Sequence, residues 1–284
     1  MATRSGNSEQ TAEPTSSLSP LSQPNEFPVR IYTLGRAGLV VDGKPIVFSG
    51  KAQKRPLSLL FCLIAQGGRN VTLTRLYHAL WDVPDSASSQ RGSLDTAIYR
   101  LRRLLRHTDA ICISNGSVSL DTRICWVDVW AFERLLGEST QTDDLLTMAD
   151  LIKQALDHYQ GEFLASMDAD MHLGDSNDAW ALAARERLRT RLLRLVQVVA
   201  DKLAAANQWD LLADIYHRLH ERYPLDEMVC RQLLRTYIER QEATQAIDLF
   251  KRCRKLLANG LHSLPSPATL ALLRRLPGID LDHI

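Results

Sequence analysis

The sequence lacks the features that define several large classes of protein. No run approaches the roughly 18 consecutive apolar residues of a membrane-spanning helix, and the N-terminus has no apolar segment like that of a secretory signal peptide. The cysteines number only five and lie in apolar patterns, which fits reduced core thiols better than a disulfide framework. We therefore expect a cytoplasmic protein whose thiols stay reduced.

Sequence patterns typical of enzymes and cofactor sites are missing as well. No G-x-x-x-x-G-K-[ST] motif that would cradle a nucleotide phosphate is present, and no Ser/His/Asp or Cys/His arrangement can be argued. His217 and His220 are three residues apart and could share a metal, but no further ligand is evident, so solvated histidines are favoured. We expect no enzymatic activity, no cofactor and no metal.

Glutamate is absent from residues 27–125, and this stretch is strongly basic. It holds 14 lysines and arginines against 6 aspartates, which gives a net charge of +8. Residues 126–284 hold 19 basic against 24 acidic residues, which gives −5. The overall charge of +1 is therefore divided between a basic half and an acidic half. We expect the basic half to bind a polyanion and the acidic half to contact other partners.

The first 26 residues are rich in Ser, Thr, Pro, Gln and Asn. Such a composition cannot bury enough apolar surface to offset the entropy lost on ordering the chain. We expect residues 1–26 to be disordered, either as a free end or as a linker from a segment removed upstream.

Strand and helix signals alternate after this tail. Asp42-Gly43 is a turn signal between strand-like runs, and Asn115-Gly116 between alternating apolar residues is a strong hairpin signal. Thr72 or Thr74 could cap a short helix, and Lys51, Lys54 and Arg55 before another helix could meet phosphate. The expected strands are residues 29–34, 39–41, 45–48, 111–113 and 118–120, and the expected helices are residues 57–66 and 74–81.

The most informative stretch is residues 90–106, QRGSLDTAIYRLRRLLR. Its apolar residues recur at helical spacing and share one face: Leu94, Ile98, Leu101 and Leu105. The other face carries arginines and short polar side chains, which suit a helix that reads bases and binds phosphates in a major groove. The alternative is a solvated arginine-rich face. Ser88 or Ser89 could cap the helix.

The order of sheet, two helices, basic helix and hairpin is that of a winged helix-turn-helix. Residues 27–125 resemble the OmpR/PhoB-type DNA-binding domain, through Ala79-Leu80-Trp81 and the run from Ile98 to Leu105. In that family the third helix enters the major groove and the hairpin wing touches the minor groove. The wing tip here, Ser114 to Ser117, departs from the family pattern because it has no basic residue.

The resemblance implies a set of DNA contacts and a contact with RNA polymerase. Thr96 and Arg100 match base-reading positions, and the loop before the basic helix meets polymerase in many relatives. This loop is short and acidic, so Asp82 and Asp85 either contact polymerase or belong to a simple connector. The implied contacts with the DNA backbone are Ser93, Tyr99, Arg102 and Arg103.

Residues 126–284 are almost entirely helical in pattern. Asp128 could cap the first helix. A shift of 34 residues places Leu203 on Tyr237 and Tyr216 on Phe250, which is the tetratricopeptide period, in which helix pairs stack over a shared core. The expected helices are residues 143–159, 177–206, 209–222, 226–240, 243–258 and 267–275.

This half also resembles the bacterial transcriptional activator domain found in antibiotic-pathway regulators of the SARP type. The resemblance rests on Trp126-Val127-Asp128 through Phe132, on Tyr223 to Glu227, on Ala246 to Phe250 and on Leu264 to Pro267. The glycine that the family usually has before its last helix pair is replaced here by Arg240-Gln241.

Together these observations predict a mainly α protein, with an α+β winged helix domain at residues 27–125 and an all-α, tetratricopeptide-like activator domain at residues 126–284. We expect a sequence-specific transcriptional regulator, an activator that binds promoter DNA, contacts RNA polymerase and could form a homodimer on repeated sites. The alternative is a tetratricopeptide adaptor that binds protein, or binds DNA without sequence choice. The charge division and the arginine-rich helix favour the regulator.

Overall fold

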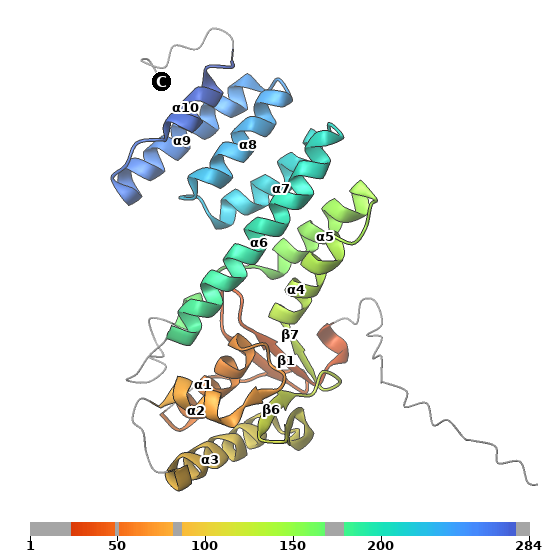
Figure 1. Ribbon diagram of the computed structural model, residues 1–284, viewed down its shortest axis with the longest axis vertical. Helices are drawn as coiled ribbons and strands as arrows, with labels where there is room; N and C mark the ends of the chain where they lie inside the picture. Colours follow the sequence, from red (N-terminus) through yellow and green to blue (C-terminus); the bar gives the residue numbers. More distant parts are fainter. Residues whose placement is uncertain (1–23, 49–50, 82–86, 168–178, 277–284) are drawn as a thin grey trace, which may run out of the picture.

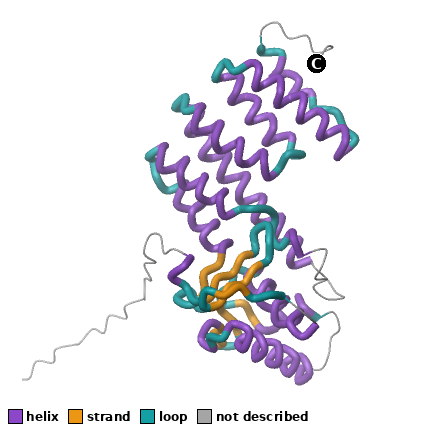
Figure 2. Tube along the Cα trace, turned by 180° about the vertical axis from the view of Figure 1, so that it is seen from behind, coloured by secondary structure: helices purple, strands orange, loops and turns teal. Residues whose placement is uncertain are grey.

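The computed structural model describes residues 24–48, 51–81, 87–167 and 179–276. The strands gather with the first helices of the chain at one end of an elongated molecule, and a stack of helices forms the other end (Figures 1 and 2). This confirms the predicted mainly α fold. None of the helices in these ranges combines the length and the apolar character of a transmembrane segment. Residues 1–23 of the predicted tail lie outside the described ranges, and its last residues, Pro24–Glu26, form a short 3-10 turn.

The first sheet has the order β3-β2-β1-β7. Strands β1 (Val29–Tyr32) and β2 (Gly38–Val41) fall on two of the predicted strand ranges and pair antiparallel. Strand β3 (Lys44–Pro45) is shorter than the predicted run over residues 45–48. Strand β7 (Cys125–Val127) was not predicted: it is buried along its length and pairs parallel with β1.

Three helices follow β3: the predicted Thr72 cap is confirmed for the second, and the other two begin earlier than predicted. Helix α1 (Lys51–Ala65) begins before the predicted residue 57 and contains Pro56, whose ring removes one backbone donor near the start. Thr72 caps α2 (Leu73–Leu80), where its hydroxyl accepts from the Arg75 backbone N–H at 3.3 Å. Helix α3 (Ala87–Leu105) begins before Ser88 and Ser89, so these serines lie inside the helix and the predicted cap is wrong.

The predicted hairpin is present and forms the wing. Strands β5 (Ile111–Ser114) and β6 (Ser117–Leu120) pair antiparallel, and β4 (Val71–Thr72) extends their sheet in the order β4-β6-β5. Asn115 and Gly116 have φ values of 49° and 73°, the left-handed geometry of a tight hairpin turn. The Gly116 carbonyl also accepts from the Leu73 N–H at 2.9 Å, which ties the wing tip to the start of α2.

The rest of the described chain is helical, with bounds close to the predicted ones. The 34-residue period extends to the backbone of the turns: Asn207 and Gln241 have φ values of 56° and 62°. Each is followed by a residue whose N–H donates to a carbonyl five positions back, at 2.9 Å in both turns. The helices are α4 (Asp128–Ser139), α5 (Leu145–His158), α6 (Ala179–Ala205), α7 (Trp209–Arg222), α8 (Glu227–Glu239), α9 (Ala243–Leu261) and α10 (Pro267–Leu273).

Asp128 does not cap α4 in the predicted way, because it is the first residue of that helix and its carboxylate points back to the end of β1. It accepts from the Thr33 and Leu34 N–H groups at 2.6 and 2.8 Å and from the Thr33 hydroxyl at 2.7 Å. Its only helical partner is the adjacent Val129 N–H, at 2.8 Å. Burial raises the pKa of this carboxyl from 3.8 to about 6.

The segment after β1 also lies beside the loop that follows α5. The Gly35 N–H donates to the Glu162 carbonyl at 3.0 Å, and the Leu164 N–H donates to the Thr33 carbonyl at 2.7 Å. Gly35 has a φ of 88°, and a Cβ at this position would lie 2.7 Å from the Gln160 carbonyl carbon. Buried side chains form one continuous core through both ends of the molecule, so the winged-helix end and the helical stack are packed together.

Candidate nucleic-acid interface

Helix α3 is held against the winged-helix core by the face that the sequence predicted. Leu94, Ile98, Leu101 and Leu105 are all buried, together with Ala97. These side chains share one stripe because their spacing matches the helical repeat. The stripe packs mainly on α1 and to a lesser extent on α2, so the orientation of the opposite face is determined by the core.

The opposite face of α3 is exposed to solvent. Thr96, Arg100 and Arg103 are exposed, and the Tyr99 side chain is 61% exposed, which is unusual for a large aromatic residue. Ser93 is half-buried at the edge of this face. Among the described residues, neither Arg100 nor Arg103 has a hydrogen-bond or ion-pair partner for its side chain. These guanidinium groups are therefore available to an anionic ligand.

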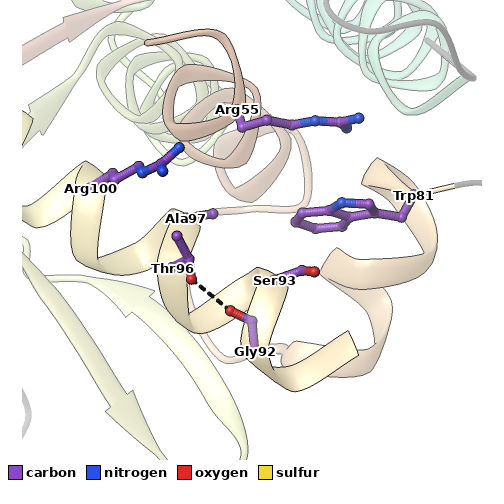
Figure 3. Close-up of a pocket in the computed structure, with 7 residues that line it drawn as sticks. All are labelled: Arg55, Trp81, Gly92, Ser93, Thr96, Ala97 and Arg100. Carbon is purple, nitrogen blue, oxygen red and sulfur yellow. Dashed lines mark hydrogen bonds between the residues drawn. The ribbon is translucent and has the colours of Figure 1, made fainter. Parts of the chain in front are cut away.

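A hollow of about 440 Å³ lies beside the exposed face of α3 (Figure 3). Arg55 of α1 and Arg100 of α3 stand at its edge, and the Trp81 indole forms one wall. The Arg55 guanidinium lies 5.5 Å from the Trp81 ring centroid and donates to the Leu80 carbonyl at 2.8 Å. The remaining lining residues are Gly92, Ser93, Thr96 and Ala97.

Two of these residues were interpreted differently from the sequence. Trp81 was predicted to end the helix over residues 74–81, but it follows the last residue of α2, is only partly buried and lines the hollow. Arg55 was expected near a helix start, whereas it lies within α1 and is held by Leu80 and Trp81. The Arg-to-indole contact joins α1 to the end of α2, and no local sequence pattern signals such a contact.

Arg102 has a structural contact instead of a free guanidinium group. It is half-buried, and its Nη2 donates to the Ile111 carbonyl at 2.8 Å, at the start of β5. Arginine side chains that anchor backbone carbonyls in this way position secondary-structure elements. Arg102 therefore joins the end of α3 to the wing, and its contact with the DNA backbone stays a prediction.

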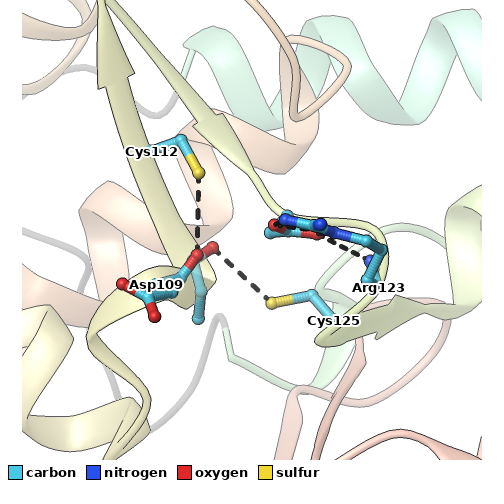
Figure 4. Close-up of polar contacts among 6 residues, drawn as sticks. Asp109, Cys112, Arg123 and Cys125 are labelled. Atoms are coloured by element: carbon cyan, nitrogen blue, oxygen red, sulfur yellow. Dashed lines mark hydrogen bonds and ion pairs between the residues drawn. The ribbon is translucent and has the colours of Figure 1, made fainter. Parts of the chain in front are cut away.

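The base of the wing holds one exposed arginine and two thiols (Figure 4). The Arg123 side chain is 86% exposed, and its Nη2 lies 2.6 Å from Asp121 Oδ2, which lowers the pKa of that carboxyl. Cys125 is buried, and burial raises the pKa of its thiol to about 12. Cys112 is exposed, so it is not the core thiol that the sequence predicted.

The other predicted site residues are placed as follows. Asp82 and Asp85 lie outside the described residues. His217 is hydrogen-bonded to Tyr237, with 2.6 Å between the imidazole Nε2 and the phenol oxygen. His220 is half-buried, and burial lowers the pKa of its imidazole. No group of three or more potential metal ligands occurs among the residues that the structure describes.

Comparison with known proteins identifies the helical half. Residues 127–276 match the family described as bacterial transcriptional activator domain. The regulatory protein DnrI of Streptomyces peucetius is 28% identical over 246 residues, which cover 80% of this chain and 86% of DnrI. The regulatory protein AfsR of Streptomyces coelicolor is 24% identical over 265 residues, which cover 92% of this chain and 25% of AfsR.

A solved structure shares the fold. Mycobacterium tuberculosis EmbR, in complex with a low-affinity phosphopeptide, superimposes with a TM-score of 0.60 at 18% identity, over 88% of this chain and 65% of the EmbR chain. The chain thus spans about two thirds of that EmbR chain and a quarter of AfsR. Because the family match covers more than half of its residues, the chain belongs to the bacterial transcriptional activator domain family and is a transcriptional regulator of the SARP type.

Proposed function

We propose that this regulator binds duplex DNA by placing the exposed face of α3 in the major groove. Thr96 and Arg100 would face base edges, and Ser93, Tyr99 and Arg103 would contact the sugar-phosphate backbone. The observation that carries the proposal is the free, arginine-bearing face of α3, which the buried stripe on its other side presents to solvent. Arginine can donate two hydrogen bonds to guanine, and this pairing is the commonest base-specific contact.

The hollow beside α3 supports the same assignment. Arg55 is held on the Trp81 ring, so its guanidinium group is oriented before any ligand arrives. A phosphate next to the groove would meet Arg55 on one side and Arg100 on the other. Preorganised cations of this kind fix the register of a helix on DNA, whereas base contacts provide the sequence choice.

The charge distribution supports a division of labour between the two halves. In this proposal residues 27–125, with a net charge of +8, form the winged helix DNA-binding domain. Residues 126–284, with a net charge of −5, form the activator domain and add no phosphate contacts. Affinity would then come mostly from counterion release by the first part and would fall steeply with salt concentration.

The activating contacts belong to the same proposal. Asp82 and Asp85 would offer an acidic surface next to the DNA to RNA polymerase, and the stacked helices would contact a partner or a second copy on repeated sites. DnrI and AfsR are both named regulatory proteins, and such a role in bacteria would be exercised in the cytoplasm without any enzymatic step.

Selection from random duplexes tests the proposal. The full chain is immobilised, mixed with randomised DNA, and the bound fraction is amplified and sequenced over several rounds. We expect one motif to be enriched, and a variant that carries both Arg100→Ala and Arg103→Ala to enrich none. Uniform recovery of all sequences by the parent chain would instead support an adaptor that binds DNA without sequence choice.

A further inference from the structure

A second hollow lies at the junction between the winged-helix end and the helical stack. Its volume is about 410 Å³, within the range of roughly 300–1,000 Å³ that is typical of small-molecule sites. None of its lining residues belongs to the DNA contacts proposed above. They come from the approach to β1, the turn after α1, the segment that contains β7, and α4: Phe27, Gly67, Arg69, Thr122, Cys125, Trp126, Val127, Trp130, Ala131, Glu133 and Arg134.

The walls of this junction pocket include two indole rings that are held in place. Trp126 lies against Tyr32 and His158, with ring centroids 5.4 and 5.8 Å away. The Trp130 Nε1 donates to the Gly67 carbonyl at 3.2 Å, which joins α4 to the turn after α1. Fixed aromatic rings offer flat apolar surfaces, and a planar ring stacks on them without a large loss of side-chain entropy.

The charged groups of the pocket favour an anion. The Arg69 guanidinium lies 5.4 Å from the Trp130 ring centroid, is exposed, and has no ion-pair partner among the described residues. Arg187 and Arg191 approach the Glu133 carboxylate at 3.3 and 3.4 Å and neutralise it. The Arg69 guanidinium group is therefore a positive charge without an ion-pair partner, and it lies beside the aromatic wall.

We propose that the junction pocket binds a small planar aromatic carboxylate. The ring would stack against the indole walls, and the carboxylate would face the Arg69 guanidinium group. An aliphatic acid would lack the stacking, and a neutral aromatic compound would lack the ion pair. Because the walls come from both ends of the molecule, the bound ligand stabilises the junction between them.

Titration of the full chain with 1-naphthoate tests this proposal, with 1-naphthamide and hexanoate as comparators. Calorimetry gives the affinity, and NMR of 15N-labelled indole groups gives the location. We expect saturable 1:1 binding that shifts the Trp130 indole signal and leaves the signal of Trp209, on α7, unchanged. The absence of saturable binding at millimolar naphthoate, or binding that leaves the Trp130 signal in place, would overturn the proposal.

A matched pair of variants tests the role of the charge. Arg69→Gln removes the exposed guanidinium group, and Arg36→Gln removes another exposed one that does not line the pocket. We expect Arg69→Gln to weaken 1-naphthoate binding by about twofold to fivefold, the size of one solvent-exposed ion pair, and to leave 1-naphthamide unaffected. Arg36→Gln should bind both compounds like the parent chain. Equal naphthoate affinity of Arg69→Gln and the parent would refute the anion preference.

Discussion

The Asp128 carboxylate accepts hydrogen bonds from both the backbone N–H and the hydroxyl of Thr33, 95 residues earlier in the chain. This contact joins the first residue of α4 to the end of β1 next to the parallel pairing of β1 with β7. The first helix of the activator domain therefore starts from a fixed position on the winged-helix sheet. A shift of α4 would break these hydrogen bonds, which are shielded from water.

Replacing Asp128 with Asn should destabilise the protein. Asn has one side-chain oxygen where Asp has two, and its amide nitrogen cannot accept a hydrogen bond. At least one of the buried N–H groups that now donate to Asp128 therefore loses its partner. We expect a loss of about 1–3 kcal/mol in the free energy of unfolding, measured by urea denaturation. Asp150→Asn on α5, where the carboxylate is exposed, is the control and should change little. Equal stability of the two variants would show that the contact is unimportant.

The pH dependence of stability should carry the signature of Asp128. Burial raises the pKa of this carboxyl from 3.8 to about 6 in the folded protein. The Asp128 carboxyl therefore binds a proton more tightly in the folded state than in the unfolded state. Its contribution to the free energy of unfolding is lost as the pH rises from about 4 to 6. The full effect is about 3 kcal/mol for a shift of this size. The stability difference between the parent and Asp128→Asn should therefore narrow with rising pH; a constant difference would argue against the raised pKa.

The turn before α9 offers a stabilising substitution. Gln241 has a left-handed φ of 62°, a conformation that costs roughly 1–2 kcal/mol for most residues but little for glycine. Gln241→Gly should raise the free energy of unfolding by about 0.5–1 kcal/mol, after the entropy cost of glycine in the unfolded chain. Asn207→Gly is the matched control in the preceding repeat, because asparagine tolerates this conformation. A lower unfolding midpoint for Gln241→Gly would contradict the prediction.

Charge reversal at Asp82 and Asp85 should separate DNA binding from activation. In the proposed complex, changing both residues to Lys adds positive charge near the DNA and should maintain or increase promoter affinity. If these residues contact RNA polymerase, transcription in a purified system should fall at equal DNA occupancy. The same reversal at Asp143 and Asp150, in the helical half, is the control. Transcription that follows occupancy in both variants would make the loop a simple connector.

Local and regularly repeated sequence patterns predicted much of the fold. The spacing of the leucines and Ile98 gave the buried face of α3, and Asn115-Gly116 gave the wing turn. The 34-residue period predicted a repeated helix pair, and the structure extends it to the backbone of the turns. These features depend on neighbours along the chain or on regular repetition, so they can be read from a single sequence.

Contacts between distant segments could not be predicted in this way. Strand β7 forms because it lies beside β1, nearly a hundred residues earlier, and its three residues carry no alternating pattern. Arg102 was grouped with the exposed arginines because its Ile111 partner comes from the next element. Asp128 looked like an ordinary helix cap. In each case the partner is a side chain or backbone group that only the tertiary structure brings close.

Arg100 is the residue that we propose reads a base from the exposed face of α3. The most direct test measures the affinity of the parent and Arg100→Ala for the selected site and for every single-base variant of it, at one salt concentration. Arg254→Ala, on α9 at the opposite end of the molecule from α3 (Figure 1), is the charge-matched control. We predict that Arg100→Ala loses about 1–3 kcal/mol on the selected site and discriminates less at one base position only. An Arg100→Ala variant that keeps the parent's affinity and its preference at every position would contradict the proposed base contact.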